Sequence, residues 1–246
     1  MNANNPYKYK LSIITATYNA IEHLPKLIEC LRNQEDKDFE WVVADGASTD
    51  GTLELLESIT DLNIVITSQE DFGIYDALNR GIKASSGEFY LTMGADDLLY
   101  PNAVKEYRNA IDDKVDVITA SIKIGNEISQ AGSRGKSWFA AQFAYVSGHA
   151  VGSLFRKSLH KRYGYYSRKF PIAADQLFIL KVCKAGAATK VIKPIVGEHI
   201  LVGVSSFDVL GTMTEYYRVQ LLTGENKFIQ TALFILRLLK HYRRLK

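Results

Sequence analysis

The stretch GEFYLTMGADDLLYP, residues 87–101, decides the fold of this chain. Within it, residues 89–93 are aromatic, apolar or β-branched without a break, and a glycine lies near each end, which predicts a short buried strand. Asp96 and Asp97 follow this strand, and Pro101 suits the first position of a helix. A buried strand, an acidic loop and a helix in this order are typical of one unit of an α/β sheet.

The two adjacent carboxylates after this strand need a positive partner. Side by side and partly buried, Asp96 and Asp97 repel each other and lose hydration. Mg²⁺ or Mn²⁺ would relieve this repulsion, because either ion takes one or two protein carboxylates and completes its shell with phosphate and water. An Asp-Asp turn that caps the following helix is the alternative, and this stretch alone does not decide between the two.

The first half of the chain repeats this unit four times. We expect strands at 11–15, 41–45, 63–67 and 89–93, and helices that begin near 22, follow the turn at 45–51, span 74–84 and begin at 101. This alternation with short loops indicates a mostly parallel sheet with helices on both faces. Ligands of such sheets bind beyond the carboxyl ends of the strands. Polar residues follow three of these ends: Tyr18, Asn19, Asp45, Asp96 and Asp97.

The second half of the chain is less regular. We expect strands at 115–120, 122–128, 190–196 and 199–202, a loop at 132–136, and helices at 156–163, 173–185, 209–222 and 227–242. The aromatic segment 138–146 receives no assignment. No low-complexity linker interrupts the first 205 residues, so they are expected to form one unit.

Composition limits the class of protein. The 246 residues are 47% hydrophobic and 23% charged, which is ordinary for a soluble globular protein with a substantial core. Cys30 and Cys183 have no neighbouring metal-ligand or disulfide motif, so a reducing compartment is expected. The polar N-terminus lacks the apolar core of a signal peptide, and no stretch reaches the roughly 20 apolar residues of a membrane span. These features predict a cytoplasmic protein.

Four motifs occur in a fixed order and spacing. They are SIITATYN at 12–19, VVADGASTDGT at 42–52, GIYDALNRGI at 73–82 and GADD at 94–97. Together they resemble family 2 of the glycosyltransferases, an inverting family with the GT-A fold. The stretch 149–180, with IAAD at 172–175, resembles the branch that builds bacterial O-antigen and related surface polysaccharides. The resemblance implies a Rossmann-like GT-A domain at 1–205, followed by a C-terminal helical extension at 206–246.

The resemblance also implies a nucleotide-sugar donor, with UDP as the expected nucleotide. Tyr18 offers a ring face to the base, and Asp45 can accept a hydrogen bond from a uracil N–H. The alternatives are an aromatic packed on the sheet edge for Tyr18 and a turn-forming aspartate for Asp45. In the family, the metal ligand falls at Asp97, and the remaining donor-site positions fall at Thr17, Gly73, Asp76, Asn79 and Asp96.

Asp175 is the expected general base. An inverting transfer needs one carboxylate beside the acceptor hydroxyl, on the face opposite the leaving nucleotide. The family places its base at this position, where Ala174 precedes a single acid. Asp175 would also suit the N-cap of the following helix, so this alternative remains. His149 and His199 could approach the metal or the acceptor, although a lone histidine is more often structural.

The C-terminal segment concentrates basic charge. The formal net charge is +3, yet the last ten residues hold five basic residues and no acid: Arg237, Lys240, Arg243, Arg244 and Lys246. A nucleic-acid binder would spread this charge over a folded face, so no nucleic acid is expected. The apolar residues of 227–246 suit a helix at an anionic membrane surface, near a lipid-linked saccharide acceptor at the inner face of a bacterial membrane. A helix packed on the protein is the alternative.

Two other functions fit part of this pattern. A nucleotidyltransferase could use a similar sheet and acids, but it would usually have a Gly-rich basic loop where this chain has ATYN at 16–19. A nucleotide-sugar-binding protein without catalysis would use the same donor residues and would not need Asp175.

Overall fold

The computed structural model describes residues 7, 9–131, 135–200 and 208–244. The strands in this part of the chain are β1 (Tyr9–Thr17), β2 (Glu40–Asp45), β3 (Ile64–Ser68), β4 (Gly87–Thr92), β5 (Leu98–Leu99), β6 (Val117–Ile124), β7 (Glu127–Ser129), β8 (Ser153–Arg156) and β9 (Thr189–His199). The helices are α1 (Leu24–Arg32), α2 (Thr52–Glu57), α3 (Ile74–Ala84), α4 (Ala103–Ala110), α5 (Ser137–Ala140), α6 (Leu159–Tyr163), α7 (Ala174–Lys184), α9 (Val209–Leu222) and α10 (Lys227–His241), with 3₁₀ turns η1 (Ala141–Ala144) and η2 (Tyr242–Arg244).

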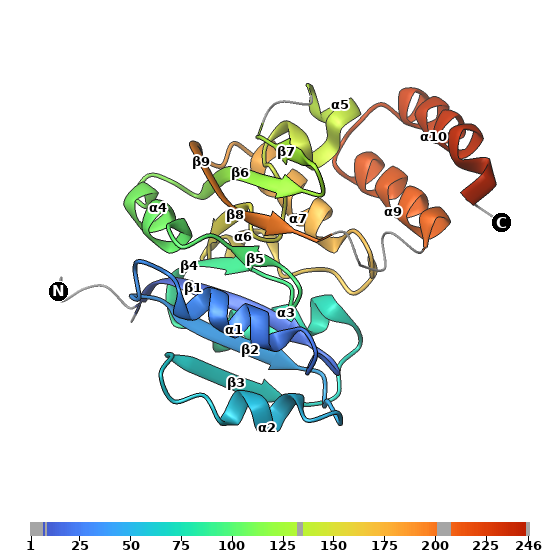
Figure 1. Ribbon diagram of the computed structural model, residues 1–246. Helices are drawn as coiled ribbons and strands as arrows, with labels where there is room; N and C mark the ends of the chain where they lie inside the picture. Colours follow the sequence, from blue (N-terminus) through green and yellow to red (C-terminus); the bar gives the residue numbers. More distant parts are fainter. Residues whose placement is uncertain (1–6, 8, 132–134, 201–207, 245–246) are drawn as a thin grey trace.

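All described strands join one central sheet flanked by helices (Figure 1). Their order is β3-β2-β1-β4-β8-β6-β9-β5, and β7 pairs with β6. The first four strands along this order are parallel, as the alternation predicts. In the second half, β8 runs antiparallel between β4 and β6, while β9 is parallel to β6. The α/β prediction is confirmed, and the antiparallel strands make the far half of the sheet mixed.

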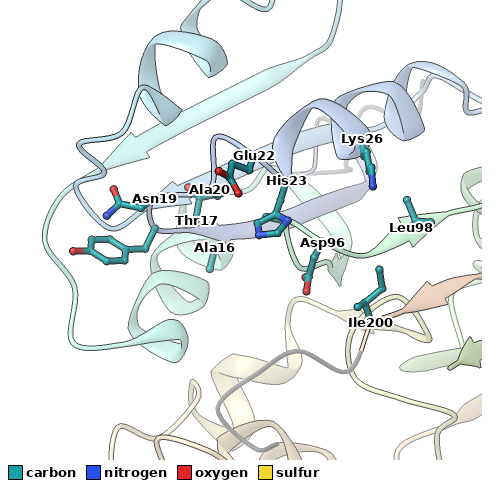
Figure 2. A pocket seen from close by; sticks show the side chains of 12 residues that line it. Ala16, Thr17, Asn19, Ala20, Glu22, His23, Lys26, Asp96, Leu98 and Ile200 are labelled. Carbon is teal, nitrogen blue, oxygen red and sulfur yellow. The ribbon is translucent and has the colours of Figure 1, made fainter. Parts of the chain in front are cut away.

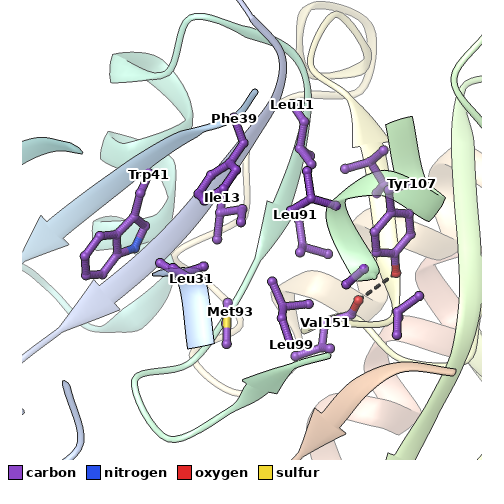
Figure 3. Close-up of a cluster of buried hydrophobic side chains, with 14 of the residues drawn as sticks. Leu11, Ile13, Leu31, Phe39, Trp41, Leu91, Met93, Leu99, Tyr107 and Val151 are labelled. Atoms are coloured by element: carbon purple, nitrogen blue, oxygen red, sulfur yellow. Dashed lines mark hydrogen bonds between the residues drawn. The ribbon is translucent and has the colours of Figure 1, made fainter. Parts of the chain in front are cut away.

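The two faces of the sheet bury different helices. On β1, Ile13 points into a cluster with α1, α2 and α4, and the next residue, Ile14, points into a cluster with α3 and α7. This alternation follows from the period of two along a strand. The apolar face predicted for the first helix is buried at all its positions, namely Leu24, Leu27, Ile28 and Leu31. Figure 3 shows Leu31 in the first cluster, together with the Tyr107 hydroxyl that donates to the Val151 carbonyl at 2.6 Å.

Several boundaries differ from the sequence-based expectations. Pro101 lies in a turn and α4 begins at Ala103 with Asn102 as N-cap, so neither Asp96 nor Asp97 caps this helix. The expected strand at 122–128 turns back at Gly125, which has φ 58°, to form the hairpin of β6 and β7.

Two further segments differ from the expectations. The helix expected at 156–163 begins only at Leu159, because Arg156 belongs to β8, a strand that the sequence does not predict since four residues are too few to show a period. The strands expected at 190–196 and 199–202 form the single strand β9 up to His199, and residues 201–202 lie outside the described part of the chain. The unassigned segment 138–146 contributes to α5 and η1.

The C-terminal helices α9 and α10 lie side by side and pack on the second half of the chain (Figure 1). Val219 of α9 is buried in the same cluster as α7. The buried Glu215 carboxylate accepts hydrogen bonds from the N–H groups of Ile172 at 3.0 Å and Ala173 at 2.8 Å. Since the N-cap residue Ala173 has no side-chain cap of its own, α9 supplies an acceptor and a negative charge at the start of α7.

Among the described residues, no helix combines the length and apolar character needed to cross a bilayer. The expected domain boundary at 205/206 lies outside the described residues.

Candidate active site

Asp45 ends β2 as a fully buried carboxylate. It accepts hydrogen bonds from the Thr17 hydroxyl at 2.9 Å, the Ser68 hydroxyl at 2.9 Å, and both the N–H and the hydroxyl of Ser48 at 2.9 and 2.5 Å. Burial opposes its ionisation, but these bonds outweigh burial and lower the pKa of Asp45. A uracil N–H would therefore have to displace one hydroxyl donor, because all four in-plane acceptor positions are used.

A pocket of about 470 Å³ lies beside the carboxyl ends of β1 and β4. Three of the predicted donor-site residues line it, namely Thr17, Tyr18 and Asp96. The Tyr18 ring is 70% exposed, so it is available to stack on a ligand. His23 and Lys26 of the α1 segment add basic groups to the wall, and Figure 2 shows His23 beside Asp96. The size falls within the usual range for a small-molecule site.

The two adjacent aspartates differ in environment. Asp96 is half-buried on the pocket wall, and burial together with the neighbouring charge of Asp97 raises its pKa. Asp97 is 1% exposed, and its Oδ2 accepts from the Gly94 N–H at 2.8 Å. A Cβ on Gly94 would lie 2.7 Å from Asp96 Oδ1 and 3.1 Å from Asp97 Oδ2, so a side chain at this position would displace these carboxylates.

His199 at the end of β9 completes this corner of the site. Its Nδ1 lies 2.8 Å from Asp97 Oδ1, and the Ile200 N–H donates to the same oxygen at 3.1 Å. Burial opposes protonation of His199, but the bond to Asp97 and the charges of Asp97, Asp96 and Asp175 raise its pKa. The sequence does not decide whether His199 has a structural or a functional role. Its contact with Asp97 joins residues that are 102 positions apart, so no local pattern predicts it.

The pair of Asp97 and His199 fits a divalent cation. Among the residues that the structure describes, no three His, Cys, Asp or Glu side chains gather to enclose a metal. Mn²⁺ or Mg²⁺ in a nucleotide site nevertheless needs few protein ligands, because phosphate oxygens and water complete its shell. Asp97 Oδ1 and His199 Nδ1 are both ligand atoms, and a cation could replace the proton between them.

Asp175 lies in the first turn of α7, two residues after Ala173, whose N–H donates to Glu215. The N-cap of this helix is Ala173, so the alternative role of Asp175 as N-cap is wrong. The Tyr75 hydroxyl donates to Asp175 Oδ1 at 2.6 Å, and His149 Nδ1 lies 3.8 Å from Oδ2. Burial lowers the pKa of His149, and the charges of Asp175 and Asp97 oppose this shift.

The predicted residues of α3 face the segment before α7. Gly73, with φ 103°, is the N-cap of α3, and the left-handed backbone there favours glycine. Asp76 pairs with the Arg168 guanidinium. The Asn79 amide makes two 2.9 Å hydrogen bonds, to the N–H and the carbonyl of Tyr166. None of the three lines the pocket described above, and their contacts to the donor stay predictions.

A chain of hydrogen bonds runs inward from His149. His149 Nε2 lies 2.8 Å from the Tyr166 hydroxyl, which lies 2.9 Å from the Tyr90 hydroxyl. Tyr90 in turn lies 2.8 Å from His160 Nε2, and His160 Nδ1 lies 3.0 Å from the Gly164 carbonyl. Burial lowers the pKa of His160 to about 4.

We expect the buried neutral His160 to make stability fall below neutral pH. The unfolded state takes up a proton near pH 6.5, whereas the folded state resists protonation until pH 4, so stability is lost as the pH falls through this window. At pH 5 the loss is about 2 kcal/mol. Urea unfolding at pH 7.5 and pH 5 measures it, and in His160→Gln the difference between the two pH values should shrink by this amount. An unchanged difference would contradict the assignment.

The family model for glycosyl transferase family 2 matches residues 12–185. This range holds all four sequence motifs and Asp175. The chain belongs to glycosyl transferase family 2. Membership of this family favours glycosyl transfer over nucleotidyl transfer.

Curated relatives of this glycosyltransferase match parts of their length. A PGL/p-HBAD biosynthesis glycosyltransferase of Mycobacterium bovis is 39% identical over 92 residues, which cover 36% of this chain and 36% of that protein. An uncharacterized glycosyltransferase of Haemophilus influenzae is 26% identical over 197 residues, or 72% of this chain and 61% of the relative. A cholesterol galactosyltransferase of Borreliella burgdorferi is 30% identical over 121 residues, or 48% and 34%. The chain thus spans less than two thirds of these relatives.

Solved structures of glycosyltransferases share the fold. Staphylococcus aureus TarS, in complex with UDP-GlcNAc, matches with a TM-score of 0.70 and 22% identity over 95% of this chain and 73% of that one. The mannosyltransferase PcManGT from Pyrobaculum calidifontis, in complex with GDP-Man and Mn²⁺, matches with a TM-score of 0.70 and 18% identity over 98% and 76%. The GT-A fold expected from the motifs is confirmed.

Sequence reasoning missed two residues that touch the site. Tyr75 lies within the quoted motif 73–82, but its bond to Asp175 spans 100 residues, and no local pattern signals it. Glu215 contacts the start of α7 across 42 residues.

Proposed function

We propose that this glycosyltransferase moves a sugar from a UDP-sugar to an acceptor hydroxyl with inversion at the anomeric carbon. The observation that carries the proposal is one site with two kinds of carboxylate. Asp97 lies beside a histidine and suits a metal-bound diphosphate, whereas Asp175 lies beside a tyrosine and suits proton transfer. His149 lies 3.8 Å from Asp175 Oδ2 and 3.4 Å from the Thr92 hydroxyl at the end of β4, the strand that leads to Asp97, so donor and acceptor groups would meet near this histidine.

UDP is favoured by the residues around the pocket. Tyr18 offers an exposed ring face, and the buried Asp45 carboxylate behind Thr17 would accept a uracil N–H if one of its hydroxyl donors moved aside. The complexes of TarS with UDP-GlcNAc and of PcManGT with GDP-Man and Mn²⁺ support a nucleotide-sugar donor and a divalent cation. Asp97 and His199 would hold Mn²⁺ or Mg²⁺, which supplies charge stabilisation to the leaving diphosphate when bound.

The transfer is a single displacement. Asp175 accepts the proton of the acceptor O–H, and the electron pair of that bond forms the new bond to the anomeric carbon. The bond from this carbon to the diphosphate oxygen breaks, and its electron pair leaves with UDP. Attack from the face opposite the nucleotide gives a β-linkage from an α-linked donor.

The acceptor that we propose is a lipid-linked oligosaccharide of O-antigen-type surface polysaccharide synthesis. The names of two relatives, one in PGL/p-HBAD biosynthesis and one a cholesterol galactosyltransferase, support an amphiphilic acceptor. Helix α10 supports a place at an anionic membrane surface. One side of it exposes Phe228, Ile229, Ile235, Leu236 and Leu239. The same helix carries basic residues and no acid.

We expect Leu236→Glu with Leu239→Glu to weaken binding to anionic vesicles at least tenfold. The two side chains are 60% and 65% exposed, so the substitutions remove apolar contact with lipid without opening the core. Co-sedimentation with phosphatidylglycerol-containing vesicles measures the effect. The matched control is Ile128→Glu with Val191→Glu, two exposed apolar residues on β7 and β9, which should bind as the parent does. Equal loss in both variants, or none in either, would exclude α10 as the lipid-binding helix.

Thermal unfolding with UDP-, GDP- and dTDP-sugars, each with and without Mn²⁺, tests the donor site. A ligand at a hundredfold excess over its Kd stabilises the folded state by about 2.7 kcal/mol. A Mn²⁺-dependent rise in Tm with the UDP series is expected. Absence of a shift with every nucleotide would overturn the donor assignment.

A further inference from the structure

We propose that His149 is a positioning residue for Asp175: its Nδ1 presents a lone pair to the carboxyl group and accepts a hydrogen bond once Asp175 has taken the acceptor proton. This inference rests on the proposed role of Asp175 as the base. It follows from the direction of the hydrogen-bond chain between His149 and His160.

The chain has one possible direction when both histidines are neutral. A carbonyl oxygen only accepts, so His160 Nδ1–H donates to Gly164. Burial holds His160 neutral at pH 7, and its Nε2 must accept from the Tyr90 hydroxyl. Tyr90 has then used its proton and accepts from Tyr166, which accepts in turn from His149 Nε2–H.

This direction leaves His149 Nδ1 without a proton. Burial and the charge of His199 lower the pKa of His149, against the opposing charges of Asp175 and Asp97, so its neutral form is favoured. The Thr92 hydroxyl lies 3.4 Å from Nδ1 and donates to its lone pair only weakly at that distance, and Asp175 Oδ2 lies 3.8 Å away, where it would compete with Thr92 for the lone pair once protonated. The longer distance is expected between two acceptors, and a proton on Oδ2 would turn the contact into a hydrogen bond.

Tyr75 selects the oxygen that takes the proton. Its hydroxyl donates to Asp175 Oδ1 at 2.6 Å, which leaves Oδ2, the oxygen nearer His149, for the proton of the acceptor. The Ile172 carbonyl lies 2.9 Å from the same hydroxyl, but both neighbours only accept, and the single Tyr75 proton goes to the shorter contact with the charged Asp175 oxygen. The two oxygens of Asp175 therefore have separate partners, a donor on one side and an acceptor on the other.

The turn that carries His149 is strained. Val151, a buried β-branched residue, has φ 64°, a backbone conformation that is unfavourable for this residue type. Its N–H donates to the Thr92 carbonyl at 2.9 Å, and its carbonyl accepts from Tyr107 at 2.6 Å. These bonds hold the turn against β4 and fix the position of His149 relative to Asp175.

Asp175 and His149 account for the proton that the acceptor loses. The acceptor O–H bond breaks, its proton moves to Asp175 Oδ2, and the new O–H of Asp175 donates to His149 Nδ1. The titratable groups that face His149 are Asp175 on α7, Tyr166 before α7, Asp97 after β4 and His199 at the end of β9. Any pH dependence of the pair includes these groups.

His149→Gln tests the Nδ1 lone pair. The glutamine amide can still donate to Tyr166 from the position of Nε2 but offers no acceptor at the position of Nδ1. We expect kcat for hydrolysis of the best UDP-sugar of the thermal panel to fall 10- to 100-fold, with KM within threefold. Because protonated Asp175 loses its acceptor, the acidic limb of the kcat profile should move to lower pH.

Two comparisons separate the outcomes. If Asp175→Asn retains activity, the proposed base is wrong; if Asp175→Asn is inactive while His149→Gln keeps the parent kcat and pH profile, the role of His149 alone is overturned. Nitrogen chemical shifts of ¹⁵N-histidine in the parent protein test the same point without any loss of folding. An unprotonated Nδ1 in His149 is expected, and a proton on Nδ1 would overturn the inference.

Discussion

Asp175→Asn is expected to lower kcat of sugar transfer by about 10³-fold while the Kd for the UDP-sugar stays unchanged. The amide keeps the size of the carboxyl group and can still bond to Tyr75, but it cannot take a proton from the acceptor hydroxyl. General-base groups contribute about 10²- to 10⁴-fold to such reactions. Release of UDP from the UDP-sugar, with water or saccharide as the acceptor, measures kcat, and calorimetry measures Kd.

The control for this substitution is Asp113→Asn, which changes an exposed acid in the loop after α4. It should behave as the parent protein does. Full activity of Asp175→Asn in a folded protein would remove the base from the mechanism. A protein that binds UDP-sugars but releases no UDP, with or without Asp175, would be a donor-binding protein without catalysis.

Asp97→Asn is expected to abolish the Mn²⁺ dependence of UDP binding and to raise the Kd in Mn²⁺ at least a hundredfold, or about 2.7 kcal/mol. Asp97 is the carboxylate in contact with His199, and an amide in its place binds hard cations weakly. Titration of UDP with and without Mn²⁺ gives both constants.

The same exposed Asp113→Asn serves as control for Asp97→Asn. Asp97 also accepts hydrogen bonds from Gly94 and Ile200, so circular dichroism and thermal unfolding of the metal-free variant check that the fold survives the change. If UDP binds the variant with the Mn²⁺ dependence of the parent, Asp97 is not the metal ligand, and Asp96 becomes the candidate.

The first half of the fold is predictable because its order is local. The spacing of apolar residues in α1 predicts a helix, and the uninterrupted run of aromatic, apolar and β-branched residues in β4 predicts a buried strand. Each pattern lies within about ten residues. The carboxyl ends of parallel strands must then meet at one edge, and this brings Thr17, Asp45 and Asp97 near one another without knowledge of distant contacts.

The second half of the fold and site depends on distant pairings. Strand β8 is recognisable only between β4 and β6, since Ser153–Arg156 is too short to show a period. The partners of Asp175 and Asp97, namely Tyr75 and His199, lie 100 and 102 residues away. No sequence pattern within one element encodes such a pair, so the residues could be suspected individually but not joined.

The cap that Glu215 places on α7 limits how this enzyme can be recombined with its relatives. A chimera whose α7 comes from one protein and whose α9 comes from another would separate Asp175 from Glu215. The Glu215 carboxylate accepts hydrogen bonds at the start of the helix that carries Asp175. The segment that can be exchanged as a unit therefore runs from the second half of the sheet through α9. Diversification of acceptors by gene exchange should move α7 and α9 together, and it should keep Tyr75 of α3 compatible with Asp175.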